Sequence, residues 1–149
     1  MKIVKFILAA ILIINEIMLS HCWFSDYMKC VDNYSLIIEY NWDVKLPTNY
    51  QNSFDFNDES IYGEGIRYNI LEYDDEVELN ECLEWSQNAD PTIIDLVNAT
   101  IKAKNIDKKY SLKRERNYKF FSKSGDEDSK LYIFFDEELN TIYVLENIR

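Results

Sequence analysis

Few residues of this chain have the chemistry of a catalytic group. The only histidine, His21, follows an apolar N-terminal run that we expect to be removed from the mature protein. A mature chain without histidine has no Ser-His-Asp or Cys-His nucleophile, no histidine-bound zinc and no imidazole for acid–base work near pH 7. The sequence therefore predicts a protein that is not an enzyme and has no cofactor.

Other catalytic patterns are incomplete. Gly63-Glu64-Gly65 begins like a dinucleotide-binding loop, but Tyr68 stands at the third glycine and a strand follows in place of a helix. We expect a glycine-bearing turn there. Carboxylate pairs for glycoside hydrolysis, or Ser-Lys pairs such as Ser111 with Lys113, stay open as an alternative, because the sequence does not give distances in space.

Three acidic clusters, at 55–59, 74–76 and 126–128, could supply oxygen ligands to calcium. The first has the opening spacing of a calcium loop, but Ser60 replaces the required glycine and Ile66 replaces the final glutamate. We therefore expect solvated turns and helix starts, and no metal site.

The three cysteines are Cys22, Cys30 and Cys82. If Cys22 is lipidated or removed, Cys30 and Cys82 remain as a pair that could form a disulfide in an oxidising compartment. A bridge closing a loop of about fifty residues would add roughly 3–4 kcal/mol to stability. The alternative is two independent thiols, with Cys82 packed as a small core residue.

Basic residues concentrate in one stretch. Lys102 to Lys123 contains nine lysines and arginines and only two acids, whereas Trp23 to Ile101 contains three basic residues and seventeen acids. We expect the main basic partner surface to consist of Lys108, Lys109, Lys113, Arg114, Arg116 and Lys119. Such a surface could bind an envelope protein or an anionic polymer. The alternative is a basic segment that folds against the protein's own acids.

Composition restricts the class of protein. The chain has 149 residues, the size of one domain, and 47% hydrophobic residues, which indicates an ordinary globular core. Only 3 glycines and 2 prolines argue against a loop-rich scaffold. A formal net charge of -11 argues against a general nucleic-acid binder, because phosphates would be repelled.

The N-terminus has the layout of a secretory signal peptide. Lys2 and Lys5 precede an apolar run from Phe6 to Ile14, and small and apolar residues follow. Leu19-Ser20-His21-Cys22 is similar to a bacterial lipobox, which implies a lipid on Cys22, although His21 departs from that pattern. Ordinary cleavage after Ser20 or Cys22 is the alternative. A retained transmembrane anchor is a further alternative, opposed by Asn15 and Glu16 within the run.

After the signal, the hydrophobic pattern changes from strands to helices and back to strands. Expected strands are 35–42, 53–57, 66–73, 118–121, 131–135 and 141–146, and expected helices follow Asp75-Glu76 and Asp90-Pro91. The Asp90-Pro91 pair suits a helix N-cap followed by the first helical position. Asn140 suits a left-handed turn between the last two strands. We expect an α+β fold, a mostly antiparallel sheet with two helices packed on one face.

The chain also resembles a group of small, uncharacterised exported proteins of AT-rich Gram-positive bacteria. The resemblance covers most of the chain after residue 35. It depends on Pro47, Asp58-Glu59, Gly63-Glu64-Gly65, the helical middle and the closing Leu131–Tyr143 hairpin. It implies a compact extracytoplasmic domain and transfers no catalytic residue.

These observations predict a signal at residues 1–22 and one extracytoplasmic domain at 23–149. We expect an exported, non-enzymatic binding domain at the cell envelope, either secreted or anchored to the outer face of the membrane. Any membrane association would come through the N-terminus only, and nucleic acid is not an expected partner. The alternative is a small secreted inhibitor or immunity-type protein directed at an exported toxin or hydrolase, with its acidity steering the encounter.

Overall fold

The computed structural model describes residues 33–60, 64–75 and 77–149. The elements are α2 (Tyr34–Trp42), β1 (Tyr50–Asn57), β2 (Gly65–Tyr73), α3 (Pro91–Ala103), η1 (Lys108–Tyr110), β3 (Lys119–Ser124), η2 (Asp126–Asp128), β4 (Lys130–Asp136) and β5 (Thr141–Ile148). The strands form one five-stranded antiparallel sheet in the order β1-β2-β5-β4-β3. The predicted signal, residues 1–22, lies outside the described residues.

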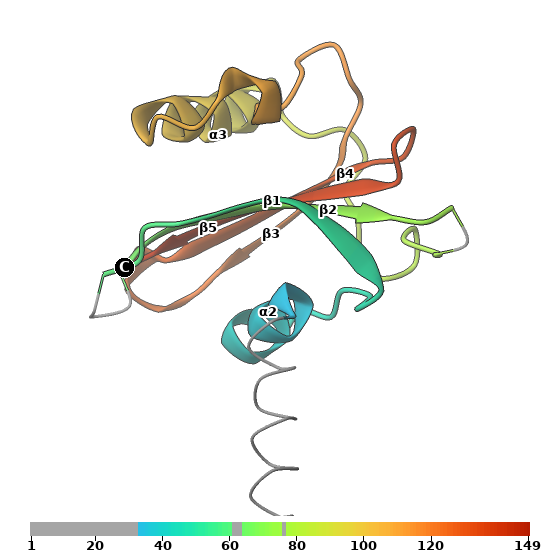
Figure 1. The fold of residues 1–149 in the computed structure, drawn as a ribbon, viewed down its shortest axis with the longest axis horizontal. Coiled ribbons are helices and arrows are strands. Elements are labelled where there is room, and N and C mark those ends of the chain that lie inside the picture. Colours follow the sequence, from blue (N-terminus) through green and yellow to red (C-terminus); the bar gives the residue numbers. More distant parts are fainter. Residues whose placement is uncertain (1–32, 61–63, 76) are drawn as a thin grey trace, which may run out of the picture.

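Both faces of the sheet are covered, and each carries an apolar core. Figure 1 shows α3 above one face and α2 below the other. The core beneath α3 includes Tyr68 and Val97, while the core against α2 includes Ile38 and Leu71. Because successive side chains of a strand point to opposite faces, a strand buried on both sides needs nearly continuous apolar residues. The almost fully buried pattern of β2, β4 and β5 meets this requirement.

The first expected strand is wrong, because 35–42 lies within helix α2. Tyr34, Ile38 and Trp42 are buried at a spacing of four residues, which places them on one helical face. The side chain of Asn33 accepts a hydrogen bond from the Ser35 amide and so caps the helix. The β-branched and aromatic content of the segment favoured a strand, but the cap and tertiary packing determine a helix.

The expected helix after Asp75-Glu76 is also wrong, because residues 77–89 contain no helix in the structure. Leu79 is buried, and its carbonyl accepts a hydrogen bond from Trp85 Nε1 at 2.9 Å. Ser86 then forms an isolated antiparallel bridge with Phe120 beside the edge strand β3. Part of the backbone of segment 77–89 therefore forms its hydrogen bonds with the edge of the sheet and not within a helix. The helix-like spacing of its apolar residues did not indicate this arrangement.

The remaining helix and the closing strands confirm the sequence prediction. Asp90 caps α3 by accepting a hydrogen bond from the Thr92 amide at 2.8 Å, and Pro91 occupies the first turn. Strands β3 to β5 form where they were expected. Asn140, with φ of 47°, provides the left-handed residue of the turn between β4 and β5.

The α+β class and the antiparallel sheet are therefore confirmed. The finer arrangement differs from the expectation. A helix precedes the first strand of the described chain, and the two helices lie on opposite faces of the sheet, not on one. Of the two α-helices, α2 precedes the first strand and α3 lies between β2 and β3 in chain order. Each core therefore contains one α-helix, and the two helices come from different parts of the chain.

Candidate functional site: a basic groove beside α3

Four of the basic residues between 102 and 123 are paired with the protein's own acids. The pairs are Lys104 with Asp58, Arg114 with Asp95, Arg116 with Asp136 and Glu138, and Lys119 with Glu137. The Arg116 guanidinium lies 2.8 Å from Asp136, whose side chain is almost completely buried. The expectation that this stretch folds against its own acids thus describes part of it, including three of the six residues in the expected partner surface.

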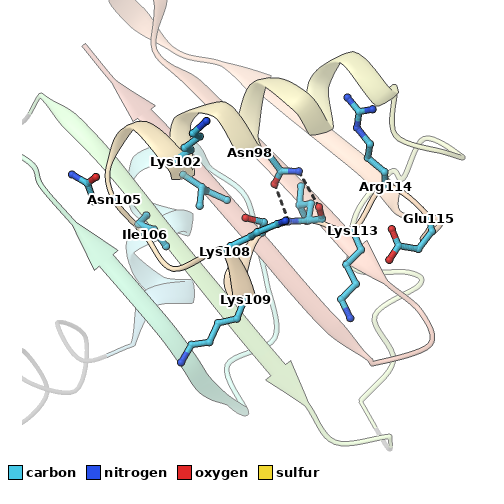
Figure 2. Close-up of a pocket in the computed structure, with 12 residues that line it drawn as sticks. Asn98, Lys102, Asn105, Ile106, Lys108, Lys109, Lys113, Arg114 and Glu115 are labelled. Carbon is cyan, nitrogen blue, oxygen red and sulfur yellow. Dashed lines mark hydrogen bonds between the residues drawn. The ribbon is translucent and has the colours of Figure 1, made fainter.

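A groove between α3 and the segment that follows it is lined by four of the other lysines, Lys102, Lys108, Lys109 and Lys113, whereas Lys123 lies on β3 outside it. We call it the basic groove; its lining residues are Asn98, Ile101, Lys102, Asn105, Ile106, Lys108, Lys109, Ser111, Leu112, Lys113, Arg114 and Glu115. Its volume is about 970 Å³. Figure 2 shows that Lys102 comes from α3, while Lys108, Lys109 and Lys113 come from the segment beside it. Lys108, Lys109, Lys113 and Arg114 of the expected surface therefore share one groove.

The chain on this side of the groove is held rigidly against α3 and the sheet. Asn98 donates from Nδ2 to the Leu112 carbonyl and accepts from the Leu112 amide at Oδ1, both at 2.9 Å. Tyr68 on β2 donates its hydroxyl hydrogen to the Tyr110 carbonyl at 2.7 Å. The Lys113 amide donates to the Tyr118 hydroxyl at 2.9 Å. A groove fixed in this way costs little conformational entropy when a partner binds.

The charges on the groove differ in how they are engaged. Within the described part of the chain, Lys102, Lys108 and Lys113 are exposed and form no ion pair. The Lys109 ammonium lies 4.6 Å from the centre of the Tyr110 ring, and its interaction with the Tyr110 side chain raises its pKa. The hydrogen bond to Asp95 raises the pKa of Arg114. Three lysines are thus left to attract an anion from solution.

Among the residues that the structure describes, two of the arrangements considered from the sequence are not formed. In the described residues, no hydrogen bond joins Ser111 to a lysine side chain, and no group of three His, Cys, Asp or Glu residues could hold a metal ion. Glu59, from the first acidic cluster, instead pairs with Arg67. Gly65 has φ of +153° and approaches the Glu59 backbone closely, which accounts for a glycine at the start of β2.

The cysteine prediction is tested only at one of its positions. Cys22 and Cys30 lie outside the described residues, so the lipid and the disulfide stay predictions. Cys82 is half-buried, and its thiol lies 3.1 Å from the Leu79 carbonyl. Burial raises the pKa of this thiol to about 11, which makes it a poor nucleophile near neutral pH.

Sequence reasoning missed a buried charge cluster on the other face of the sheet. Glu146 is fully buried and accepts hydrogen bonds from Tyr34 Oη and Trp42 Nε1, each at 2.6 Å. Arg67 lies opposite Glu146 on the neighbouring strand, with its NH1 atom 3.5 Å from the carboxylate. The pKa of Tyr34 is raised well above its ordinary value by burial and by the Glu146 charge. This cluster joins α2 to β2 and β5, and we regard it as structural.

Fold and site together define an α+β domain with a rigid lysine-lined groove on one side of a doubly covered sheet. Comparisons with family models, with curated proteins and with solved structures find no match to this chain. The resemblance to exported Gram-positive proteins therefore stays a prediction. None of the helices in the described part of the chain is long and apolar enough to cross a membrane.

Proposed function

We propose that this protein is a non-enzymatic binding domain whose basic groove takes an anionic partner at the cell envelope. The observation that carries the proposal is the cluster of Lys102, Lys108 and Lys113, three exposed and unpaired cations on one rigid groove. They occur in a chain of formal net charge -11, so the groove is a local exception to the overall charge. Such a patch makes a local positive potential that attracts an anion at short range, although the acidic chain as a whole repels anions at longer range.

The envelope enters the proposal through the N-terminal sequence. Lys2, Lys5 and the apolar run from Phe6 to Ile14 favour export, and Cys22 offers a site for a lipid anchor. An exported domain meets anionic polymers and proteins of the cell surface, which are the partners that a lysine-lined groove suits. Membrane attachment through the N-terminus alone would leave the groove to the partner.

The test reverses the unpaired charges of the groove. The variant K102E/K108E/K113E changes three exposed lysines, whereas reversing Arg116 would disturb its pair with buried Asp136. A matched control, K45E/K123E/K130E, makes the same change in net charge at residues that do not line the groove. The groove variant should unfold at nearly the wild-type urea concentration, because exposed charges contribute little stability. Urea unfolding of the control, in which Lys123 and Lys130 are partly buried, shows whether its fold is kept.

Binding of the purified protein to envelope material of its own host is then measured by co-sedimentation at several salt concentrations. We expect wild-type and control protein to bind and to be released by salt, because exposed charges are screened beyond about 8 Å at physiological ionic strength. The groove variant should fail to bind. Binding that is indifferent to both salt and the groove reversal, or no binding by the wild type, would overturn the proposal.

A further inference from the structure

The unpaired basic side chains of the groove are lysines, and this residue type bears on which anions the groove can bind. The unpaired cations are lysines, while the one arginine of the groove, Arg114, is already held by both oxygens of Asp95. An arginine fork binds a carboxylate or a phosphate in bidentate geometry, whereas a lysine acts as a point charge and is a common phosphate ligand. With its arginine fork taken, the groove offers point charges, which a phosphate polymer can meet without bidentate geometry.

The backbone segment 109–113 beside the groove has no free N–H group to offer a peptide. The amides of Lys109 and Tyr110 donate to Asp107, and the Ser111 amide donates to the Lys108 carbonyl. The next two amides, of Leu112 and Lys113, donate to the Asn98 side chain and the Tyr118 hydroxyl. Five consecutive N–H groups are therefore occupied. A peptide cannot add itself as a strand along this segment, which removes a common mode of peptide recognition.

The groove also lacks the platform on which nucleic-acid bases stack. No aromatic residue is among its lining residues. The ring of Tyr110, next to the groove residue Ser111, stacks on Phe54 with the ring centres 3.8 Å apart, and Lys109 lies over it. Single-stranded nucleic-acid sites combine a basic groove with exposed aromatic side chains, each stacked base adding about 1–3 kcal/mol. Here only the charge component is present.

From these contacts we propose that the basic groove binds a linear phosphate polymer that carries no bases, with Lys102, Lys108 and Lys113 contacting phosphates along it. The inference rests on the proposed function and specifies its ligand. A volume of about 970 Å³ is at the upper end of ligand pockets, which span about 300–1,000 Å³, so several phosphate groups fit. Apolar side chains of Ile101, Ile106 and Leu112 also line the groove, between the lysines.

The experiment measures binding of the purified protein to inorganic polyphosphate of defined length by isothermal titration calorimetry. Polyglutamate and a single-stranded oligonucleotide of equal total charge serve as the competing polymers, and monophosphate as the single-site probe. We expect polyphosphate to bind at least tenfold more tightly than each of the other three. Three phosphate contacts predict a slope of roughly −2 for the logarithm of affinity against the logarithm of salt concentration, taking about −0.7 per contact as for single strands.

The variants locate the binding. K102E/K108E/K113E should lose polyphosphate binding at least tenfold, the control K45E/K123E/K130E should keep it, and K102R/K108R/K113R should retain most of it. Urea unfolding of every variant shows whether the fold is kept. If the groove reversal unfolds the protein, the single variants K108E and K113E replace it, each with an expected loss of a few fold and a shallower salt slope.

The possible results separate the inference from the proposed function. If polyglutamate or the oligonucleotide binds as tightly as polyphosphate, the phosphate assignment is wrong while an anion-binding groove stands. If no polymer binds but envelope material is still captured through the groove, the phosphate assignment is again wrong and the proposed function survives. Loss of both kinds of binding overturns both. Polyphosphate binding that the groove reversal leaves unchanged places the phosphate site elsewhere and overturns the inference.

Discussion

Replacing Glu146 with glutamine removes a buried charge and changes the shape of the side chain very little. The carboxylate is fully buried and accepts two hydrogen bonds of 2.6 Å, from Tyr34 and Trp42. A glutamine amide has one oxygen and one NH₂ group, so it can accept from only one of these donors while its own NH₂ faces the other. The substitution also leaves Arg67 with Glu59 as its remaining acidic partner.

The expected loss of stability is large. Removing one member of a buried ion pair costs about 3–5 kcal/mol, because the remaining charge and donors stay desolvated. With a urea slope of about 2 kcal/mol per molar, this corresponds to a decrease of roughly 1.5–2.5 M in the unfolding midpoint. Glu39→Gln is the matched control, since Glu39 lies on α2, the helix that Glu146 contacts, and pairs with Lys45 at the surface, where an ion pair contributes about 1 kcal/mol at most.

The measurement is urea unfolding followed by far-ultraviolet circular dichroism for the wild type, E146Q and E39Q. A double-mutant cycle with Arg67→Met then assigns the cause. E146Q leaves the Arg67 charge without the Glu146 carboxylate. If this unpaired charge causes the loss of stability, the double variant E146Q/R67M should be more stable than the sum of the two single changes predicts, by about 1–3 kcal/mol. An E146Q midpoint within experimental error of E39Q would refute the reasoning, since it would mean that the carboxylate does not hold α2 to the sheet.

Three further outcomes follow from individual positions. Gly65→Ala should destabilise the protein by about 1–3 kcal/mol in urea unfolding, because the new Cβ would lie 2.6 Å from Glu59 Cα at a φ of +153°; a neutral result would contradict the close approach. Cys82, as the only cysteine of a variant, should be alkylated at pH 8 at least about a hundredfold more slowly in the folded than in the urea-unfolded chain, because its pKa is raised to about 11; equal rates would show that the thiol is accessible. Hydrogen bonds from Thr92 lower the pKa of the Asp90 carboxyl in the folded protein. The contribution of Asp90 to stability is therefore complete above the unfolded-state pKa of about 3.9, and it is lost as the pH falls through the lower folded-state pKa. Asp90→Asn keeps the capping acceptor and should make stability less sensitive to acid below about pH 4, whereas an unchanged acid profile would show that Asp90 does not contribute.

Local signals in the sequence were sufficient where they agreed with the final packing. Asp90-Pro91 and the apolar spacing after it identify α3, and Asn140 identifies the turn before β5. The prediction for the segment that forms α2 was wrong because its composition favours a strand. Its helical pattern consists of only three buried apolar residues, Tyr34, Ile38 and Trp42. The helix expected after Asp75-Glu76 failed because the edge of β3 offers backbone pairing that the sequence does not show.

The candidate site was visible from the sequence only in part. The count of basic residues between Lys102 and Lys123 identified the region of the groove. Which of them are neutralised depends on acids far away in the chain, such as Asp58 for Lys104 and Asp136 for Arg116. Glu146 gave no signal at all, because a carboxylate near the end of a strand is ordinarily a surface residue. Whether a charged residue is neutralised, exposed or buried depends on partners that are distant in sequence, and a single sequence does not reveal those partners.

The hydrogen bond between Tyr34 and Glu146 has a consequence for the order in which the protein can fold. It joins residues 112 positions apart, so α2 cannot complete its docking site until β5 has been synthesised and paired. At a synthesis rate of about 5–20 residues per second, the helix segment waits roughly 6–22 s for its carboxylate partner. During that time the core that Ile38 and Trp42 enter is incomplete, because Ile142 and Val144 of β5 belong to it. Helix α2, the first element of the described chain to be synthesised, is thus among the last to complete its tertiary contacts. Contacts between residues so far apart in sequence favour slow folding.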